Sequence, residues 1–271
     1  MGLQHILSTM HRTDASFVGG MQCNCPVLVV NQANGVDDIS TAVGNVPVRM
    51  ITTPERGLSN SRNRLLENAE AEICILGDDD LLYISGYDEI IRRAYREHPD
   101  ADIIAFSFTQ SLTENTRRQF KKAKKLNIFS ISKIDSVELT FKTKSVSDAG
   151  ISFCTLLGLG AKYGSSEENA FLADALRAGL KIWYVPETIC YLLPDPPERV
   201  KWQQGFDRDY FVKRGACFYR IYGWSSMLFG AVFLLLKKRN IFKSVPLFSA
   251  LKWMREGKRQ FRKDEEDQKC S

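Results

Sequence analysis

The sequence predicts an α/β protein with a mostly parallel central sheet flanked by helices, followed by a C-terminal helical extension. Short β-branched apolar runs alternate with helical patterns, which is typical of an α/β sheet. The predicted strands are almost continuously apolar, as parallel strands covered on both faces are. The 271 residues suit one α/β domain of roughly 200 residues plus an appendage. A hydrophobic content of 44% and a net charge of +5 exclude a disordered or collagen-like chain.

Five apolar runs have the length and composition of buried strands. Each is short, rich in Val, Ile or Leu, and bounded by polar or turn-forming residues. The predicted strands are residues 3–8, 26–31, 46–52, 72–77 and 102–107.

Three helical patterns accompany these strands. The first carries Leu65 inward, and Ser59 or Asn60 is expected to cap its start. The second has an apolar stripe that ends before Pro99. The third covers residues 167–178 and is followed by a glycine, the usual end signal of a helix.

Two segments depart from this alternation. Residues 109–147 are polar and rich in Lys, and we interpret them as an insertion or an excursion from the sheet. Residues 199–243 hold ten Lys or Arg against two Asp and include the apolar run 224–236. Because a spanning helix needs about 20 apolar residues, this run is not expected to cross a bilayer. The charged end, residues 263–269, is expected to fray.

Cysteine and histidine usage narrows the chemistry. Seven Cys without paired C-x-x-C motifs argue against a zinc site or a disulfide framework and favour reduced thiols in the cytoplasm. The polar N-terminal segment lacks the apolar core of a signal peptide. All three His lie at or before His98, so a late catalytic or metal-binding His is not expected.

Three consecutive carboxylates form the clearest candidate site. Asp78, Asp79 and Asp80 directly follow the apolar run 72–77. Ligands of open parallel sheets bind at the carboxyl ends of the strands. Clustered carboxylates there favour a divalent cation such as Mg²⁺ or Mn²⁺. An acidic surface turn is the alternative interpretation.

Two further motifs begin helices. Gly57 permits a tight turn into the first helix, where free amides and the side chains of Arg56 and Arg62 suit a phosphate. An ordinary capped helix with solvated arginines explains this motif equally well. Glu167 and Glu168 open the third helix, where they serve either as favourable first-turn acids or as a general base.

Two nucleotide-binding fingerprints are excluded. The glycine run at residues 158–164 has the wrong spacing for a dinucleotide fold and does not follow the first strand. The sequence also has no G-x-x-x-x-G-K-[ST] segment, which excludes a P-loop.

Taken in order, these motifs resemble an inverting family 2 glycosyltransferase with the GT-A fold, of the bacterial polysaccharide-biosynthesis type. The resemblance runs from about residue 6 to residue 186. It rests on the end of the first strand, the turn before Arg62, the Asp cluster and the two acids that open the third helix. Residues 179–186, a glycine, an apolar strand and a proline, fit as well. The resemblance implies a GT-A catalytic domain over residues 1–205 and a basic, apolar helical extension over 206–271.

The resemblance also implies roles for the acidic residues. Asp78 and Asp80 match the family's Asp-x-Asp element, which holds Mn²⁺ or Mg²⁺, and Asp79 would lie toward the ribose or the sugar. Glu168 matches the family's catalytic base. Glu167 would position the acceptor or support the turn.

The nucleotide would lie beside the first two strands. The resemblance places Ser8, Thr9 and Asn31 in the nucleotide pocket, with Arg62 nearby, and the helix-start motif adds Arg56 as a further candidate for binding the donor. The family commonly has an Asp where this chain has Asn31, so recognition of the nucleotide departs from the family pattern. The family's usual Glu-Asp pair is Glu-Glu here, so the placement of the catalytic base departs from it as well.

The implied activity is transfer of a sugar from a nucleotide-diphosphate donor, a UDP-sugar being favoured, to a saccharide acceptor that is either free or lipid-linked, in cell-surface polysaccharide synthesis. Two alternatives stay open: a non-catalytic saccharide- or nucleotide-binding module on the same fold, and a metal-dependent phosphohydrolase. The latter would want Asp-x-Asp-x-Thr or Val after its first strand, whereas Leu81 and Leu82 follow this cluster.

The basic and apolar tail suggests a location. Residues 206–243 combine cations, including Lys237, Lys238 and Arg239, with aromatic and aliphatic side chains, as interfacial helices on anionic lipid do. The alternative is a helix packed on the catalytic domain with solvated cations. A cytoplasmic protein is expected, and the first of these two interpretations would make it peripheral on the inner face of the plasma membrane. Nucleic acid is not, because spaced stacking aromatics are missing from the basic stretch.

Overall fold

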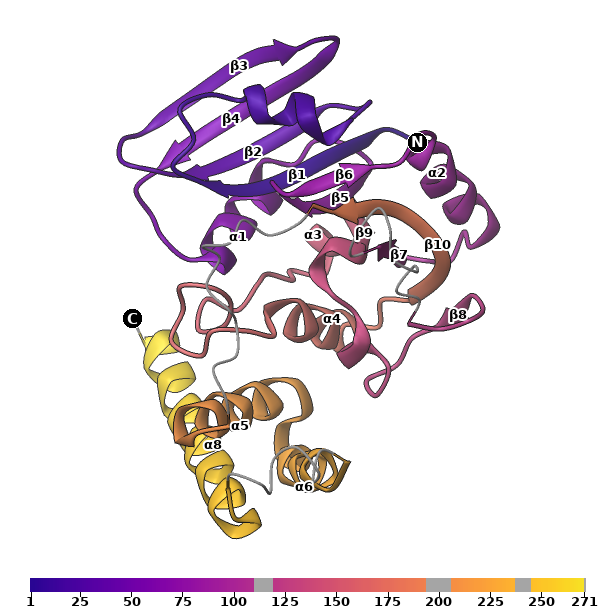
Figure 1. Ribbon diagram of the computed structural model, residues 1–271. Helices are drawn as coiled ribbons and strands as arrows, with labels where there is room; N and C mark the ends of the chain where they lie inside the picture. Colours follow the sequence, from indigo (N-terminus) through magenta and orange to yellow (C-terminus); the bar gives the residue numbers. More distant parts are fainter. Residues whose placement is uncertain (110–118, 194–205, 237–244, 271) are drawn as a thin grey trace.

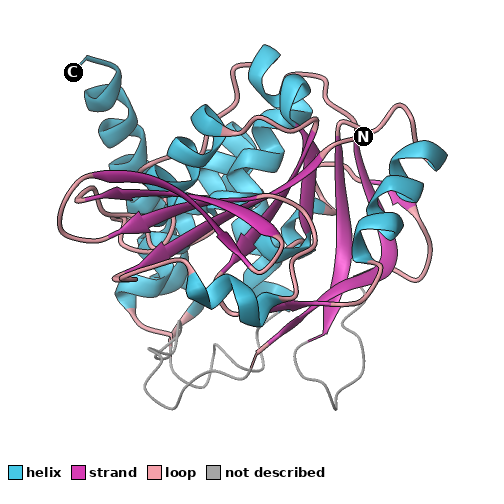
Figure 2. Ribbon diagram, turned by 90° about the horizontal axis from the view of Figure 1, so that it is seen from above, coloured by secondary structure: helices cyan, strands magenta, loops and turns pink. Residues whose placement is uncertain are grey.

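The structure is a computed structural model, and it describes residues 1–109, 119–193, 206–236 and 245–270. The predicted α/β class is confirmed: a twisted sheet has helices on both sides (Figures 1 and 2). The strand order is β3-β4-β2-β1-β5-β9-β7-β10-β6, and β8 pairs with β10. The strands are β1 (Leu3–Met10), β2 (Val27–Gln32), β3 (Asp37–Val43), β4 (Val46–Thr53), β5 (Ile73–Asp78), β6 (Leu81–Tyr83), β7 (Ile103–Thr109), β8 (Lys124–Lys125), β9 (Leu139–Lys142) and β10 (Ile182–Leu192).

Alternating side chains of the parallel strands β1, β2 and β5 build two cores. Ile6 and Leu28 face a core closed by the helices α1 and α4, whereas Leu7 and Val29 face one closed by α2 and the short helix η1. Burial on both faces explains the continuous apolar runs. The helices of this part are η1 (Ser16–Met21), α1 (Leu58–Asn68), α2 (Tyr87–Glu97), η2 (Ile131–Lys133), η3 (Ser136–Glu138), α3 (Thr143–Asp148) and α4 (Glu167–Arg177).

The start of α1 differs from the prediction. The N-cap is Gly57, at φ +106°, and no side chain caps the helix. Ser59 lies inside the helix and donates its hydroxyl to the carbonyl of Leu157 at 2.7 Å. The expected cap at Ser59 or Asn60 is therefore wrong, because the hydroxyl has a better partner in a neighbouring loop.

Residues 109–147 are not simply an insertion. They supply β9, which lies antiparallel between β5 and β7 near the middle of the sheet. The sequence pattern does not predict this strand because polar residues surround it, although Leu139 and Phe141 are fully buried. The predicted strand that ends at Pro186 continues to Leu192, with an irregular register past residue 184.

The C-terminal extension consists of α5 (Arg208–Tyr222), η4 (Gly223–Ser225), α6 (Ser226–Leu236) and α8 (Leu247–Cys270). Glycines bring α5 and α8 into backbone contact: a Cβ on Gly215 would lie 2.1 Å from the carbonyl oxygen of Met254, and one on Gly257 1.8 Å from that of Val212. Phe211, buried against Leu234 and Met254, centres a small separate core.

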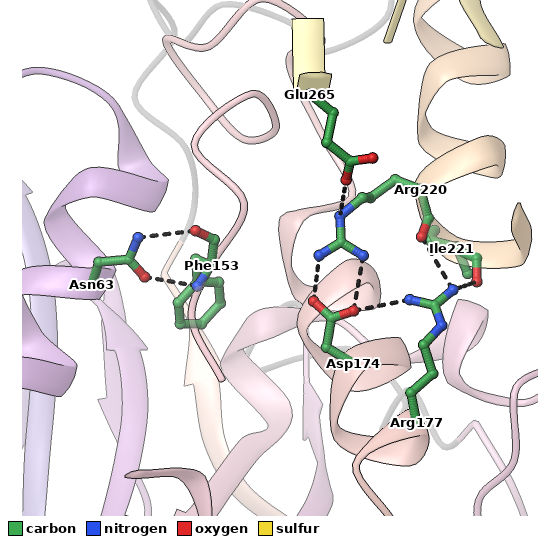
Figure 3. Close-up of polar contacts among 7 residues, drawn as sticks. All are labelled: Asn63, Phe153, Asp174, Arg177, Arg220, Ile221 and Glu265. Carbon is green, nitrogen blue, oxygen red and sulfur yellow. Dashed lines mark hydrogen bonds and ion pairs between the residues drawn. The ribbon is translucent and has the colours of Figure 1, made fainter. Parts of the chain in front are cut away.

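The extension packs against the α/β part through side chains of α5 and α8. Arg220 of α5 forms an ion pair with Asp174 of α4 and lies 3.8 Å from Glu265 of α8, and Arg177 donates to the carbonyl of Ile221 (Figure 3). The expected fraying at the C-terminal end is wrong, since Asp264 in α8 accepts a hydrogen bond from Tyr163 at 2.5 Å.

One helical run among the described residues, Arg208–Leu236, is long and apolar enough to cross a membrane by length and composition. Only 22% of its most apolar window is buried. Gly223, at φ +58°, separates the run into α5 and α6.

Candidate active site

The Asp cluster lies at the carboxyl ends of adjacent parallel strands, as predicted. Ser8 of β1 pairs in register with Asp78 of β5, so the ends of both strands meet there. Ser8 is buried and accepts a hydrogen bond from Ser61 of α1 at 2.9 Å. Thr9 donates its hydroxyl to Asp79 at 2.5 Å. Ser8, Thr9 and the aspartates therefore share one edge of the sheet, where a ligand of an open sheet binds.

Asp79 has a cationic partner that the sequence did not suggest. The guanidinium of Arg12, just past β1, binds the Asp79 carboxylate at 2.7 Å and lies 4.8 Å from the centre of the Phe17 ring. Arg12 is 41% exposed. A single arginine in a polar loop carries no sequence signal, so only the fold reveals this contact.

Asn31 holds this cation in place. Its amide nitrogen donates to the backbone carbonyl of Arg12 at 2.8 Å, and its oxygen accepts from the Arg12 amide at 3.1 Å. The side chain is buried, and it also lies 3.4 Å from the hydroxyl of Thr52. Asn31 therefore shapes the loop at the site, and its predicted contact with the nucleotide stays a prediction.

The two predicted arginines do not lie together. Arg56 binds its own surroundings: it donates to the carbonyls of Pro54, Thr53 and Ala33 and to the side chain of Asn34. Its guanidinium thus fastens the loop between β4 and α1.

The phosphate site predicted at the start of α1 is partly blocked. The first amide, that of Leu58, is bonded to the carbonyl of Leu159 at 2.9 Å. The loop can come this close because residues 158 and 160 are glycines. A Cβ on Gly158 would lie only 3.0 Å from the hydroxyl oxygen of Ser59, and one on Gly160 only 3.3 Å from the Cα of Gly57. The glycine run that imitates a dinucleotide fingerprint instead packs a loop on a helix end.

Arg62 is the centre of the site. It is 1% exposed and donates to Glu167 at 2.9 Å and to Asp78 at 3.3 Å. Its guanidinium also lies 5.5 Å from the centre of the Phe153 ring, whose backbone is held by Asn63 through two hydrogen bonds (Figure 3). One buried cation therefore joins the Asp cluster to the start of α4.

The electrostatics of Arg62 follow from this placement. Burial alone lowers the pKa of Arg62, but the surrounding carboxylates, with Asp78 the strongest, more than offset this and raise it above its ordinary value. A buried cation with permanent charge is stable here only because carboxylates neutralise it.

Glu168 lies beside this pair at the first turn of α4. Burial raises the pKa of Glu168 well above its usual range, and the neighbouring charge of Glu167 raises it further, while Arg62 acts in the opposite direction. Such a shift brings a carboxylate toward the pH at which a general base works best. The next residue, Asn169, donates to the carbonyls of Ile131 and Ile134 and so ties η2 to the first turn of α4.

The predicted metal ligands Asp78 and Asp80 do not form a complete metal site by themselves. Asp78 bonds to Arg62, while Asp80 turns the chain toward β6, its carbonyl accepting the amide of Leu193. Among the described residues, no group of three or more His, Cys, Asp or Glu side chains could hold a metal ion. The hard oxygens of Asp78 and Asp80 fit Mg²⁺ or Mn²⁺ chemically, provided that a diphosphate supplies further oxygens.

Two surface hollows lie away from the Asp cluster. One, of about 840 Å³, lies at the opposite end of β5 and is lined by Glu72, Thr143 and their neighbours. The other, of about 680 Å³, lies between the α/β part and the extension, beside Asn63, Arg177 and Arg220 (Figure 3). Neither contains the residues that the sequence selected.

Comparisons with known proteins show the fold. No protein-family model matches the sequence, and no curated protein matches it either. The structure resembles crystal structures of S. aureus TarS 1-349. The complex with UDP-GlcNAc aligns with a TM-score of 0.64 at 14% identity, over 93% of this chain and 78% of that one. The complex with UDP gives 0.61 at 13%, over 93% and 78%, and a further structure of the same fragment gives 0.63 at 12%, over 94% and 79%.

The predicted fold class is therefore confirmed: the chain has the GT-A glycosyltransferase fold, with a helical C-terminal extension.

Proposed function

We propose that this protein is an inverting, metal-dependent glycosyltransferase of the family 2 type. It moves a sugar from a nucleotide-diphosphate donor, a UDP-sugar being favoured, to a saccharide acceptor in cell-surface polysaccharide synthesis, at the cytoplasmic side of the cell. The observation that carries this proposal is the junction at Arg62. Through it, one buried cation joins the Asp cluster at the end of β5 to the acids of α4, about 90 residues later in the chain.

The donor lies over the carboxyl ends of β1 and β5. Ser8 and Thr9 line the end of β1, and Arg12 offers an exposed cation to the diphosphate beside Asp79. A fold match to a protein crystallised with UDP and with UDP-GlcNAc supports a nucleotide-sugar donor. Asp78 and Asp80 would hold Mn²⁺ or Mg²⁺, which would supply neutralising charge to the diphosphate as it leaves.

Glu168 serves as the base. It accepts the proton of an acceptor hydroxyl while that oxygen attacks the anomeric carbon. The new carbon–oxygen bond forms on the face opposite the breaking bond to the diphosphate, which departs with its electron pair, so the anomeric configuration inverts. The neighbouring Glu167 has a different partner, since its carboxylate is bonded to Arg62 at 2.9 Å. Glu167 instead fixes the first turn of α4 and so positions Glu168.

A donor screen tests this proposal. The protein is incubated with nucleotide sugars and Mn²⁺ or Mg²⁺, and its unfolding temperature is measured with and without a chelator. We expect a UDP-sugar to stabilise the protein only with the metal present, since a ligand that binds the native state raises the apparent stability. Release of free phosphate without sugar transfer would favour a phosphohydrolase instead, and binding without turnover a non-catalytic module.

A further inference from the structure

One face of the C-terminal extension is apolar and uncovered. Trp224, immediately before α6, is 91% exposed, and Leu228 and Leu236 are 66% and 80% exposed. Spaced mainly three to four residues apart, these side chains lie along one side of the helix. The exposed residues of this outer face are Trp224, Leu228, Val232, Leu235 and Leu236.

The opposite face of α6 is packed against the rest of the extension. Leu234 is fully buried, and the rings of Phe229 and Phe233 pack against Tyr222 and Phe218 of α5. Since α6 contains no charged residue, its outer face is an unbroken apolar surface. Soluble monomers rarely expose such a surface without a partner.

The neighbouring helix α8 supplies positive charge. Its exposed side carries a basic row at helical spacing, formed by Lys252, Arg255, Arg259 and Lys263. Phe248, which is 88% exposed, stands at the start of the same row. The apolar face of α6 and the basic row of the neighbouring α8 correspond to the two parts of an anionic lipid surface, its acyl chains and its headgroups.

We propose that the protein docks peripherally on an anionic lipid bilayer, with the outer face of α6 in the acyl boundary and the basic row of α8 against the headgroups. The helix lies in the plane of the bilayer and does not cross it. α5 packs on α8 through the backbone contacts at Gly215 and Gly257, so only α6 is available to enter the bilayer. The 11 residues of α6 then extend only about 16 Å, against about 30 Å of hydrocarbon.

The covered face of α6 contacts a loop that leads toward Glu168. Phe129, which is 64% exposed, places its ring 5.6 Å from that of Phe229 in α6. The chain that follows it, through η2, provides the two carbonyls that bind Asn169, next to Glu168. Resting on the proposed function, docking holds at a membrane surface a helix that contacts this loop, which suits a lipid-linked saccharide acceptor.

Vesicle flotation of the full chain tests the docking. We expect the protein to float with vesicles that contain phosphatidylglycerol and to stay largely below vesicles of phosphatidylcholine alone. The double variant Leu228→Asp/Val232→Asp should lose at least about tenfold in binding, because it places two charges in the acyl boundary. Val36→Asp is the matched control: Val36 is 85% exposed before β3, so this variant should float like the wild type.

A second pair of variants tests the basic row. Lys252→Glu/Arg255→Glu should weaken binding to the anionic vesicles several-fold, and added salt should weaken wild-type binding in the same direction. Binding should also shift the tryptophan emission to shorter wavelength, and Trp224→Phe should remove this shift.

Three results would overturn the proposal. The first is a wild-type protein that remains below anionic vesicles. The second is equal flotation of the Leu228→Asp/Val232→Asp variant and the wild type. The third is a concentration-dependent dimer that this double substitution abolishes, which would assign the face to a second copy of the chain. Thermal unfolding of each variant establishes that it is folded, and the wild-type emission shift needs no variant. Since flotation requires no turnover, its failure leaves the donor screen unaffected.

Discussion

Removing the buried cation of the site should destabilise the protein strongly. The substitution Arg62→Met keeps an unbranched apolar stem but shortens the side chain and deletes the guanidinium that bonds to Glu167 and Asp78. Carboxylates near the base then lose their counter-charge in a buried place.

The magnitude follows from the burial of each partner. Arg62 is 1% exposed and Glu167 8%, so this pair counts as buried, and loss of one partner costs about 3–5 kcal/mol. Asp78 is 31% exposed, and solvent screening leaves its contribution small. With total stabilities of about 5–15 kcal/mol, such a loss removes a large part of the free energy of unfolding.

The loss should depend on pH in one direction. The pKa of Glu168 is higher in the folded protein than in the unfolded chain. The stability that protonated Glu168 contributes is therefore fully present below the pKa of the unfolded chain and is lost as the pH rises through the pKa of the folded protein. Arg62 limits this fall because it lowers the pKa of Glu168. The difference between Arg62→Met and wild type should therefore grow with rising pH and shrink toward about pH 5.

Urea unfolding at several pH values measures this difference. The matched control is Arg64→Met on the same helix, where an exposed pair with Glu55 should contribute less than about 1 kcal/mol. A loss below about 1 kcal/mol for Arg62→Met at neutral pH, or a loss independent of pH, would refute the view that Arg62 neutralises this site.

Two further substitutions test the extension and the donor end. Gly215→Ala should destabilise the protein by about 1–3 kcal/mol, because the added Cβ meets the backbone of Met254. The control Gly20→Ala should change the stability little, because nothing lies within 4 Å of its added Cβ. Equal urea midpoints for the two variants would contradict the close contact of α5 and α8. Arg12→Ala should weaken binding of a UDP-sugar roughly tenfold, as measured by calorimetry. The unfolding temperature should stay nearly unchanged, since Arg12 is 41% exposed. An unaltered affinity would show that Arg12 is not part of the donor site.

The sequence predicted the buried parallel strands well and the polar ones poorly. Residues 26–31 and 72–77 read as strands because both faces of β2 and β5 are covered. β3 is an edge strand with polar exposed residues, and β9 is short and surrounded by polar sequence, so neither gives the apolar run that identifies a covered strand. The GT-A resemblance identified the fold because it used the order of motifs along the chain, not their strength.

The candidate site was predicted in its parts but not in its connections. Position after a buried strand selected the Asp cluster as a candidate, and the family resemblance selected Glu168 from the two acids at a helix start. That Arg62 reaches Glu167, about 100 residues away in the chain, depends on how α1 and α4 pack together, which no local pattern encodes. The cation at Arg12 was missed for the same reason.

The most direct test of the account is sugar transfer by Glu168→Gln. The substitution keeps the size of the side chain and removes its capacity to take a proton. With the donor identified, we expect transfer to fall by about 10²–10⁴-fold while the donor affinity measured by calorimetry stays nearly unchanged. Turnover retained at the wild-type level would contradict the assignment of Glu168 as the base and with it the proposed mechanism.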